Sequence, residues 1–378
     1  METTRVLFAG GFPGSGKTAL LWEAALRLTA QGLRVGLITN DPSSGALLAH
    51  SGLRVEEVDG NGFGGNFNGL TAAVGRLRAE IAADVILVEP SGRSADLSAT
   101  VIQPLKQLYG RKLPLGPLSV LADPVRLNGM LRGGTSGLHP GMAYIFRKQL
   151  EESDIILVTR TDAMAPEALR QLIVQTRAAY HSCVMAVSPS SGDGIDGWLQ
   201  EAMMRHECGT RIAAVDYDAY ARGNAAVSRL DGMVRLRGKT PSDWDLFTRL
   251  LLAKLRQGFE EQACPVEHVK ILVENGDSFV AGSLTDSVSG TLSFRGSAGM
   301  GDCAKLTVGA CVETPPGALS RIVRETLDAA FAHHSHEAET DRWECLPSEC
   351  PAPACRFDKV VKMPVLLKGL RMAGPAEN

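Results

Sequence analysis

Residues 5–18, RVLFAGGFPGSGKT, join a short apolar run that favours a strand to a loop rich in glycine. Gly11, Gly16, Lys17 and Thr18 stand at Walker A spacing. The next residues, ALLWEAALRLTAQG, have helical periodicity and end at a glycine that suits a helix C-cap. Because the motif requires a strand before the loop and a helix after it, this stretch predicts a phosphate-binding loop.

The residue types of this loop suit the chemistry of phosphate binding. Glycines let backbone N–H groups face the phosphates, and the N-terminus of the following helix adds a favourable dipole. Lys17 reaches the β- and γ-phosphates, and the Thr18 hydroxyl ligates Mg²⁺. We therefore expect nucleotide binding by Gly11, Gly14, Ser15, Gly16, Lys17 and Thr18.

Five further strand-like runs follow at spacings typical of α/β proteins, at residues 34–39, 84–89, 118–123, 154–159 and 184–188. Helical stretches separate most of them. This alternation predicts an α/β fold, a P-loop NTPase domain with a mostly parallel sheet and helices on both faces. Since ligands of such sheets bind at the carboxyl ends of the strands, functional residues should come directly after each strand.

Acidic residues stand at the ends of the second and third strands. Asp41 is placed to meet Mg²⁺ or the attacking water, and it could equally cap the next helix. Glu89 ends a strongly hydrophobic strand and can sit near the metal, while the Gly92 N–H can sense a γ-phosphate. Arg93 either touches phosphate or, as is more usual, forms a surface ion pair. We expect catalysis by Lys17, Asp41 and Glu89, and Mg²⁺ binding by Thr18, Asp41 and Glu89.

The segment TRTD, residues 159–162, follows the fifth strand and favours GTP over ATP. A carboxylate at Asp162 can accept two N–H bonds from guanine, and adenine does not offer the same pair of donors. A long cationic side chain at Arg160 can stack over the base. The alternative is an ordinary loop aspartate. We expect the base to be bound by Thr159, Arg160, Asp162 and Ser188.

Length and charge limit the organisation of the chain. Its 378 residues allow two or three domains, and a net charge of −3 gives no indication of a nucleic-acid partner. The N-terminus enters a strand without a secretory signal, and no apolar run approaches a membrane span, so we expect a cytoplasmic protein with no membrane partner. We expect four parts: a P-loop domain at 1–212, a linker at 213–240, a C-terminal α+β domain at 241–332 and a tail at 333–378.

The expected C-terminal domain has a helix at 242–261, then four strand-like runs and a last helix at 316–332. This order predicts an antiparallel sheet covered by two helices. The tail after it contains three histidines followed by three cysteines in a C-x4-C-x4-C pattern, which is wider than common zinc-finger spacing. Two interpretations stay open: the thiols are incidental to a partly ordered tail, or Cys345, Cys350, Cys355 and His336 bind Zn²⁺ or another transition metal.

Four segments in this order resemble the CobW-type P-loop GTPases: GGFPGSGKTALL, ILVEPSG, KQLEESDIILVTRTD and VSPSSGDGID. The resemblance covers roughly residues 5–200. It implies a slow, partner-stimulated GTPase using GTP, GDP and Mg²⁺, which assists maturation of a metal- or corrinoid-dependent client protein, with a homodimer as a further possibility. The alternatives are a P-loop phosphotransferase acting on a small molecule, and a partner-binding protein that holds nucleotide without useful turnover.

The chain departs from the family pattern in three places. The family's Cys-x-Cys-Cys motif is matched locally by GFGG, with Gly62, Gly64 and Gly65 where the thiols would be. Glycine has no ligand side chain, so we expect this run to preserve a backbone path or to let a partner approach closely. Thr159 and Arg160 replace asparagine and lysine in the base-binding segment. Asp41 stands where glutamate is common, which shortens its reach to water and predicts slow hydrolysis.

Overall fold

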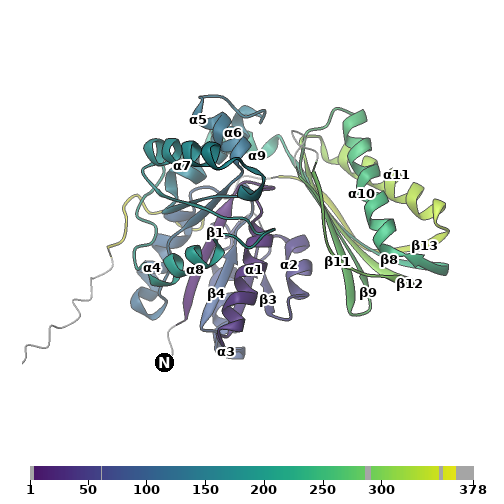
Figure 1. Cartoon of the computed structure of the whole chain (residues 1–378), viewed down its shortest axis with the longest axis horizontal. Coiled ribbons are helices and arrows are strands. Elements are labelled where there is room, and N and C mark those ends of the chain that lie inside the picture. Colours follow the sequence, from purple (N-terminus) through teal and green to yellow (C-terminus); the bar gives the residue numbers. More distant parts are fainter. Residues whose placement is uncertain (1–3, 61, 286–290, 349–351, 363–378) are drawn as a thin grey trace, which may run out of the picture.

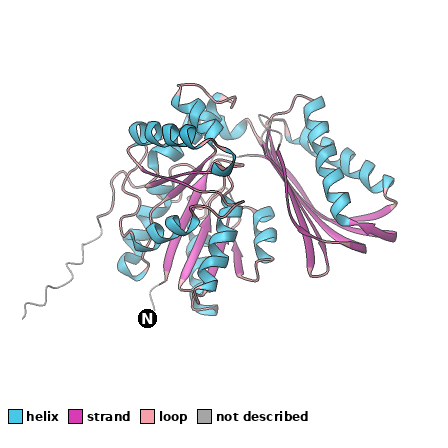
Figure 2. Ribbon diagram, viewed as in Figure 1, coloured by secondary structure: helices cyan, strands magenta, loops and turns pink. Residues whose placement is uncertain are grey.

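The computed structural model describes residues 4–60, 62–285, 291–348 and 352–362, which form two domains lying side by side (Figure 1). The N-terminal domain is a parallel sheet between two layers of helices. The C-terminal domain is an antiparallel sheet with α10 (Trp244–Glu261) and α11 (Pro316–His333) along one face (Figure 2). The predicted fold class is therefore confirmed. In the described part of the chain, no helix has the length and apolarity needed to cross a membrane.

Seven parallel strands make up the N-terminal sheet, in the order β3-β2-β4-β1-β5-β6-β7. They are β1 (Arg5–Gly11), β2 (Val35–Thr39), β3 (Arg54–Glu57), β4 (Val85–Glu89), β5 (Ser119–Ala122), β6 (Ile155–Val158) and β7 (Cys183–Ala186). The α-helices are α1 (Lys17–Ala30), α2 (Pro42–Ala49), α3 (Phe67–Glu80), α4 (Gln103–Tyr109), α5 (Pro124–Leu131), α6 (Pro140–Glu152), α7 (Pro166–Tyr180), α8 (Ile195–Met204) and α9 (Tyr217–Ala225). Short turns of other helix types are η1 (Ser98–Ile102), η2 (Gly110–Lys112) and η3 (Thr161–Ala163).

The central strand β1 shows why helices cover both faces of this sheet. All seven of its residues are buried, and successive side chains point to opposite faces. Val6 and Phe8 belong to a core that includes residues of α3 and α6. Leu7 and Ala9 belong to a second core that includes residues of α1 and α8. Each face of the sheet is therefore sealed by its own helical layer, and the loops at the strand ends remain for binding.

The edge strand β3 was not expected from the sequence. It pairs in parallel with β2, from Gly36 opposite Arg54 to Thr39 opposite Glu57. Its sequence RVEE has no apolar run, because at the edge of the sheet only Glu56 of its four side chains is buried. Backbone pairing rather than a hydrophobic pattern defines this strand.

Six antiparallel strands form the C-terminal sheet, in the order β11-β10-β9-β12-β8-β13. One face packs on α10 and α11 through Trp244, Phe247 and Leu255 on α10 and their partners on α11. An antiparallel sheet covered by two helices was predicted. The strands are β8 (Ser228–Asp243), β9 (Val266–Asn275), β10 (Ser278–Thr285), β11 (Thr291–Ser297), β12 (Met300–Val312) and β13 (His336–Pro347).

Two expected segments contain more structure than the sequence analysis gave them. Residues 213–240, expected as a linker, hold α9 and most of β8, the longest strand of the chain's second sheet. The apolar residues of β8 alternate with charged ones, and that two-residue period went unrecognised. The tail 333–378 includes β13, which pairs with β8 although nearly all its side chains are exposed. An edge strand of this kind shows no hydrophobic pattern.

After β13 the chain returns to the N-terminal domain, and we call residues 352–362 the return segment. The Ala354 N–H donates to the Gly64 carbonyl at 2.9 Å, and the Phe357 N–H donates to the Ala99 carbonyl at 3.0 Å. Arg356 pairs with the buried carboxylate of Asp96 at 2.7 Å. The segment, yellow in Figure 1, therefore binds the side of the N-terminal domain that lies away from the C-terminal domain.

Candidate functional site

The glycine-rich loop between β1 and α1 has the backbone that phosphate binding requires. Gly11, Gly14 and Gly16 have φ values of 133°, 77° and 93°, a region that side-chain-bearing residues rarely adopt. A Cβ on Gly11 would lie 2.5 Å from the Leu121 carbonyl oxygen, so only glycine fits there. Gly16 is the N-cap of α1. Because glycine has no side chain to cap the helix, the backbone N–H groups of the first turn remain available to an anion.

Polar side chains line this loop. The Lys17 ammonium donates to the carbonyls of Gly11 at 2.8 Å and Phe12 at 3.3 Å. Burial lowers the pKa of Lys17 to about 8, and the Glu89 carboxylate opposes that shift. The buried Ser15 hydroxyl has no hydrogen-bond partner among the described residues. An unsatisfied buried hydroxyl and a lysine held by loop carbonyls are donors suited to phosphate oxygens.

Three strand ends bring together the oxygens expected to hold Mg²⁺. The Thr18 hydroxyl donates to Glu89 Oε1 at 2.7 Å and lies 3.0 Å from Ser44 Oγ. Ser44 in turn donates to Asp41 Oδ2 at 3.0 Å. Glu89 Oε2 is buried without a partner in the described residues, and burial raises the pKa of this carboxyl. A donor set made only of oxygens fits a hard divalent cation such as Mg²⁺.

The structure shows one of the two roles that the sequence left open for Asp41, that of a helix cap, while its contact with Mg²⁺ or water stays a prediction. Its Oδ1 accepts from the Ser43 and Ser44 N–H groups at 3.1 and 3.4 Å, so it caps α2. Its Oδ2 accepts from Lys270 at 2.8 Å. Burial alone would raise the pKa of Asp41, but the Lys270 ammonium outweighs it and holds the pKa well below its usual range.

Lys270 is the functional residue that the sequence analysis missed. It comes from β9 of the C-terminal domain, and its ammonium contacts Ser44 Oγ at 2.5 Å and Thr18 Oγ1 at 3.5 Å, besides Asp41. Burial would lower its pKa, but the Asp41 and Glu89 carboxylates raise it. A cation from the second domain therefore lies among the oxygens expected to bind Mg²⁺.

The expected base-binding residues fall into two groups: Asp162 and Ser188 contact each other, whereas Thr159 and Arg160 contact other parts of the protein. Asp162 is exposed, and its carboxylate accepts from the Ser188 hydroxyl at 2.5 Å, so these two lie together as predicted. That hydrogen bond lowers the pKa of Asp162. Thr159 is buried and donates to the Ala122 carbonyl at 3.3 Å, which directs it into the sheet. The Arg160 guanidinium donates to Asp123, to the Gly14 carbonyl and to Thr285 of β10.

The loop after β4 packs directly against the phosphate-binding loop. A Cβ on Gly92 would lie 2.8 Å from Pro13 Cγ, so glycine is needed for this close approach. Arg93 is buried and donates to Glu267 Oε2 of β9 at 3.1 Å. The expectation of a surface ion pair is therefore wrong. Arg93 belongs to a buried contact between the two domains.

The described residues of the expected tail metal site do not come together. His336 and Cys345 are on the same strand, nine positions apart, which is roughly 30 Å at the rise of a β-strand. His336 contacts Ser242 at 2.8 Å, and the Cys345 thiol donates to the Pro316 carbonyl at 3.1 Å. Cys355 is exposed. Cys350 lies outside the described residues. The expected set of tail metal ligands is therefore wrong, because a single β-strand cannot bring residues at its two ends to one ion.

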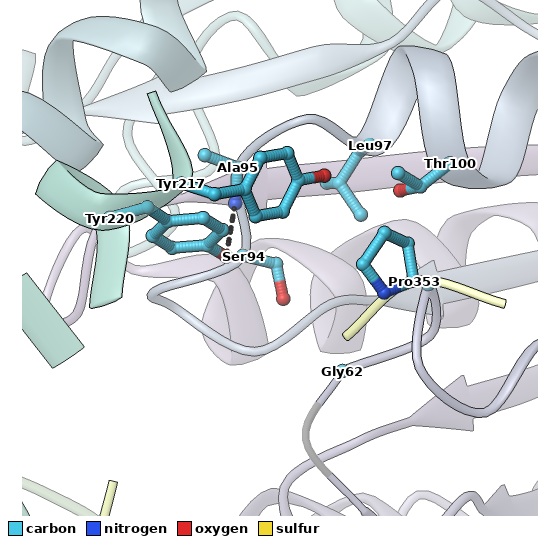
Figure 3. Close-up of a pocket in the computed structure, with 9 residues that line it drawn as sticks. Gly62, Ser94, Ala95, Leu97, Thr100, Tyr217, Tyr220 and Pro353 are labelled. Atoms are coloured by element: carbon cyan, nitrogen blue, oxygen red, sulfur yellow. Dashed lines mark hydrogen bonds between the residues drawn. The ribbon is translucent and has the colours of Figure 1, made fainter. Parts of the chain in front are cut away.

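The glycine run is covered by the chain's own return segment. Figure 3 shows Pro353 above Gly62 and beside Thr100, at a small pocket that Tyr217 also borders. A Cβ on Gly64 would lie 2.8 Å from Thr100 Oγ1, and Gly62 has a φ of 88°. These positions therefore need glycine for the backbone path and for the close approach of the chain's own Thr100, while the approach of a partner stays a prediction.

The parallel sheet, the glycine loop before α1 and the oxygens around Thr18 define a P-loop nucleotide-binding protein. Residues 5–183 match the sequence model of the family described as CobW/HypB/UreG, nucleotide-binding domain. Residues 5–183 therefore form a nucleotide-binding domain of the CobW/HypB/UreG type.

Similar solved structures include two HypB proteins. The hydrogenase maturation factor HypB from Archaeoglobus fulgidus has 14% identity and a TM-score of 0.36, covering 53% of this chain and 88% of that one. HypB from Helicobacter pylori in complex with nickel has 12% identity and a TM-score of 0.39, covering 55% and 90%. The Zn(II)-bound YjiA GTPase from E. coli has 16% identity and a TM-score of 0.32, covering 88% and 99%. No curated protein matches the chain.

Proposed function

We propose that this protein is a slow GTPase whose nucleotide state controls the contact between its two domains, and that it assists maturation of a metal- or corrinoid-dependent client. Membership of the N-terminal domain in the CobW/HypB/UreG family supports the GTPase part. The observation that carries the coupling is the position of Lys270. The C-terminal domain uses this residue to bind the same oxygens that the nucleotide's Mg²⁺ requires.

Each residue of the N-terminal site has a role in this proposal. The loop from Gly11 to Lys17 holds the phosphates, and Thr18, Asp41 and Glu89 hold Mg²⁺, which neutralises phosphate charge when bound. The second-strand loop supplies Ser44 as a further oxygen near that position. Asp162, held by Ser188, is the guanine reader, and Arg160 links this region to the phosphate loop. Thr159 supports the loop from within the sheet.

The helix α2 transmits the state of the site to the C-terminal domain. It begins at Asp41, which Lys270 binds, and it packs against β12 so closely that a Cβ on Gly309 would lie 2.8 Å from Ser43 Cβ. Mg²⁺ and the Lys270 ammonium cannot occupy the same oxygens, because two cations at one site repel each other. When Lys270 leaves Asp41, the contact of β9 and β12 with α2 weakens, and a client surface becomes accessible.

Amide hydrogen exchange tests the proposal. With a non-hydrolysable GTP analogue and Mg²⁺, amides of α2 and β9 should exchange faster than with GDP, because their shared contact is weakened. Exchange in α7, which lies away from this contact in Figure 1, serves as the internal control. Saturation by nucleotide is checked separately with a fluorescent analogue. Unchanged exchange in α2 and β9 at saturation would leave GTP binding intact and reject the coupling.

Turnover measurements test the chemical part of the proposal. The isolated chain should hydrolyse GTP far more slowly than the 1–100 s⁻¹ or so of kinases. Rapid phosphate transfer to an added small acceptor would instead indicate a phosphotransferase. Binding of GTP with no turnover, alone or with a metalloprotein client, would indicate a protein that only holds nucleotide.

A further inference from the structure

A cluster of three potential metal ligands lies at the contact between the domains, separate from the expected Mg²⁺ oxygens. It consists of Glu267 and His268 on β9 and Cys311 on β12, and one ligand atom of each lies within 4.8 Å of the others. The described residues contain no other group of three such side chains this close. Glu267 and Cys311 are buried, and His268 is partly buried.

A β-bulge explains how neighbouring residues reach one place. Cys311 of β12 pairs with His268 of β9, and the next residue, Val312, pairs with Val266. Glu267 is therefore an extra residue on β9 with no partner of its own on β12. In a regular strand the side chains of residues 267 and 268 would point to opposite faces of the sheet. The extra residue bends the strand and lets both side chains lie beside Cys311. Bulges commonly redirect side chains in this way at functional sites.

Two ligand atoms of the cluster are unsatisfied in the described structure. Glu267 Oε1 and His268 Nδ1 are both buried and have no hydrogen-bond partner there. Buried polar atoms without a partner are uncommon in proteins, and an ion is one of the ordinary explanations. Burial also lowers the pKa of His268 to about 3, so the imidazole is neutral and its ring nitrogen can donate a lone pair.

We propose that Glu267, His268 and Cys311 bind a borderline divalent transition-metal ion such as Zn²⁺ or Co²⁺. One oxygen, one imidazole nitrogen and one thiolate sulfur are ligands that such ions accept together. Ideal tetrahedral Zn²⁺ ligands are about 3.3–3.8 Å apart, as follows from bond lengths of about 2.0–2.3 Å. Because the three ligand atoms already lie within 4.8 Å of one another, they need to approach by at most about 1.5 Å to reach this arrangement. Binding releases the thiol proton of Cys311 to solvent.

Arg93 helps the ligands rather than blocking them. Its guanidinium holds Glu267 Oε2 at 3.1 Å, which fixes the carboxylate and leaves Oε1 for the ion. Burial raises the pKa of the Cys311 thiol to about 11, and the Arg93 charge acts against that rise. The cation therefore favours the thiolate that a metal needs. In the bound site, the carboxylate and thiolate charges offset the added positive charge of the ion.

The position of the cluster connects it to the nucleotide site. His268 and Cys311 line a small pocket with Asp41 and Gly92, the residues expected to respond to Mg²⁺ and γ-phosphate. Three protein ligands leave a fourth position open toward this pocket, and an open position permits ligand exchange. The role of the ion as cargo released on domain separation rests on the proposed function. The binding itself rests on the cluster alone. A chain without thiols at Gly62, Gly64 and Gly65 thus has a metal site in its second domain.

Cobalt titration of the full chain, freed of metal by a chelator, tests the proposal. A thiolate ligand gives Co²⁺ a near-ultraviolet charge-transfer band, so the intact protein should show this band saturating at one Co²⁺ per chain. Cys311→Ser should abolish it. Glu267→Gln, which keeps the side-chain shape, should weaken Co²⁺ binding at least about 10-fold. Cys345→Ser and Cys355→Ser are the matched controls and should leave the band unchanged.

The outcomes separate this proposal from the others. A band that survives Cys311→Ser overturns it, and a band lost in Cys355→Ser assigns the metal to the return segment instead. Should Cys311→Ser fail to fold, Zn²⁺ protection of Cys311 from alkylation in the wild-type chain decides, with unprotected Cys311 at saturating Zn²⁺ rejecting the site. Fluorescent GTP binding is measured in the same variants. If the wild-type protein does not bind fluorescent GTP, the proposed function is rejected, while the conclusion on Co²⁺ binding by Cys311 is unaffected.

Discussion

At the scale of single residues, we expect the specificity for guanine to depend on one exposed carboxylate. Asp162 is held by the Ser188 hydroxyl in a position open to solvent, and Thr159 beneath it is buried. Asp162→Ala should reduce the preference for GTP over ATP by about 2–3 kcal/mol, because two charge-assisted hydrogen bonds to guanine are lost. Competition titrations with both nucleotides measure this. Asp196→Asn, a surface aspartate paired with Arg27, should change nothing. Equal weakening of GTP and ATP would show that Asp162 does not read the base.

The second prediction at this scale concerns Lys270. The direction in which its replacement changes the Mg²⁺ requirement of GTP binding distinguishes two roles. If the ammonium competes with Mg²⁺ for Asp41 and Thr18, Lys270→Met should lower the Mg²⁺ concentration needed for half-maximal GTP binding by about tenfold, a change of roughly 1.4 kcal/mol. Mg²⁺ titration of fluorescent GTP binding is the measurement. Lys305→Met, which removes a partly exposed lysine of the same domain that pairs with Glu274, is the control. A higher Mg²⁺ requirement would mean that Lys270 assists nucleotide binding.

At the scale of elements, the contact of α6 with η1 places a carboxyl in the core of the N-terminal domain. Glu152 is fully buried, accepts from the Ser98 N–H at 2.8 Å, and has its pKa raised to about 8 by burial. Between pH 4.5 and 8 the unfolded chain has lost this proton while the folded chain keeps it. Stability therefore falls as the pH rises through this window, by up to about 1.4 kcal/mol per unit.

Glu152→Gln should remove this loss, because the amide is neutral at every pH and can still accept from Ser98. Urea unfolding at pH 5 and pH 8 should show a smaller decrease in the free energy of unfolding for the variant than for the wild type. Glu151→Gln changes the neighbouring residue, which pairs with Lys148 at the surface, and should keep the wild-type dependence. A parallel dependence in Glu152→Gln and wild type would place the pKa of Glu152 near its ordinary value.

The elements also show how far the sequence could predict this structure. Buried parallel strands such as β1 and β4 were found because each contains a continuous run of buried apolar residues, and the Walker A spacing fixed the loop between β1 and α1. The edge strands β3 and β13 were missed because backbone pairing holds them and most of their side chains face solvent. Lys270 was missed for a different reason. It lies 252 positions from Thr18, and no local pattern indicates a contact made only by docking of two domains.

At the scale of the whole molecule, the domains are joined by contacts that differ in kind. On one side, Lys270 with Asp41 and Arg93 with Glu267 make charged contacts near the nucleotide site. On the other, the return segment runs from β13 to Gly64 and Asp96 and involves no nucleotide residue. We therefore expect nucleotide binding to loosen the first set while the second still tethers the domains.

A chain ending at Ser348 tests this tether, because it removes the contacts of Ala354 and Arg356 with the N-terminal domain. With Mg²⁺ and a GTP analogue, small-angle scattering should show a larger increase in the radius of gyration, relative to GDP, for this chain than for the full one. A chain ending at Lys362 keeps the return segment and is the matched control. Among the described residues, truncation also leaves Tyr217 as the one side-chain partner of the buried Asp96 carboxylate, so the N-terminal domain should lose about 1–3 kcal/mol of stability. Equal expansion of all three chains would show that the return segment does not restrain the domains and that their separation is limited by the covalent connection between α9 and β8.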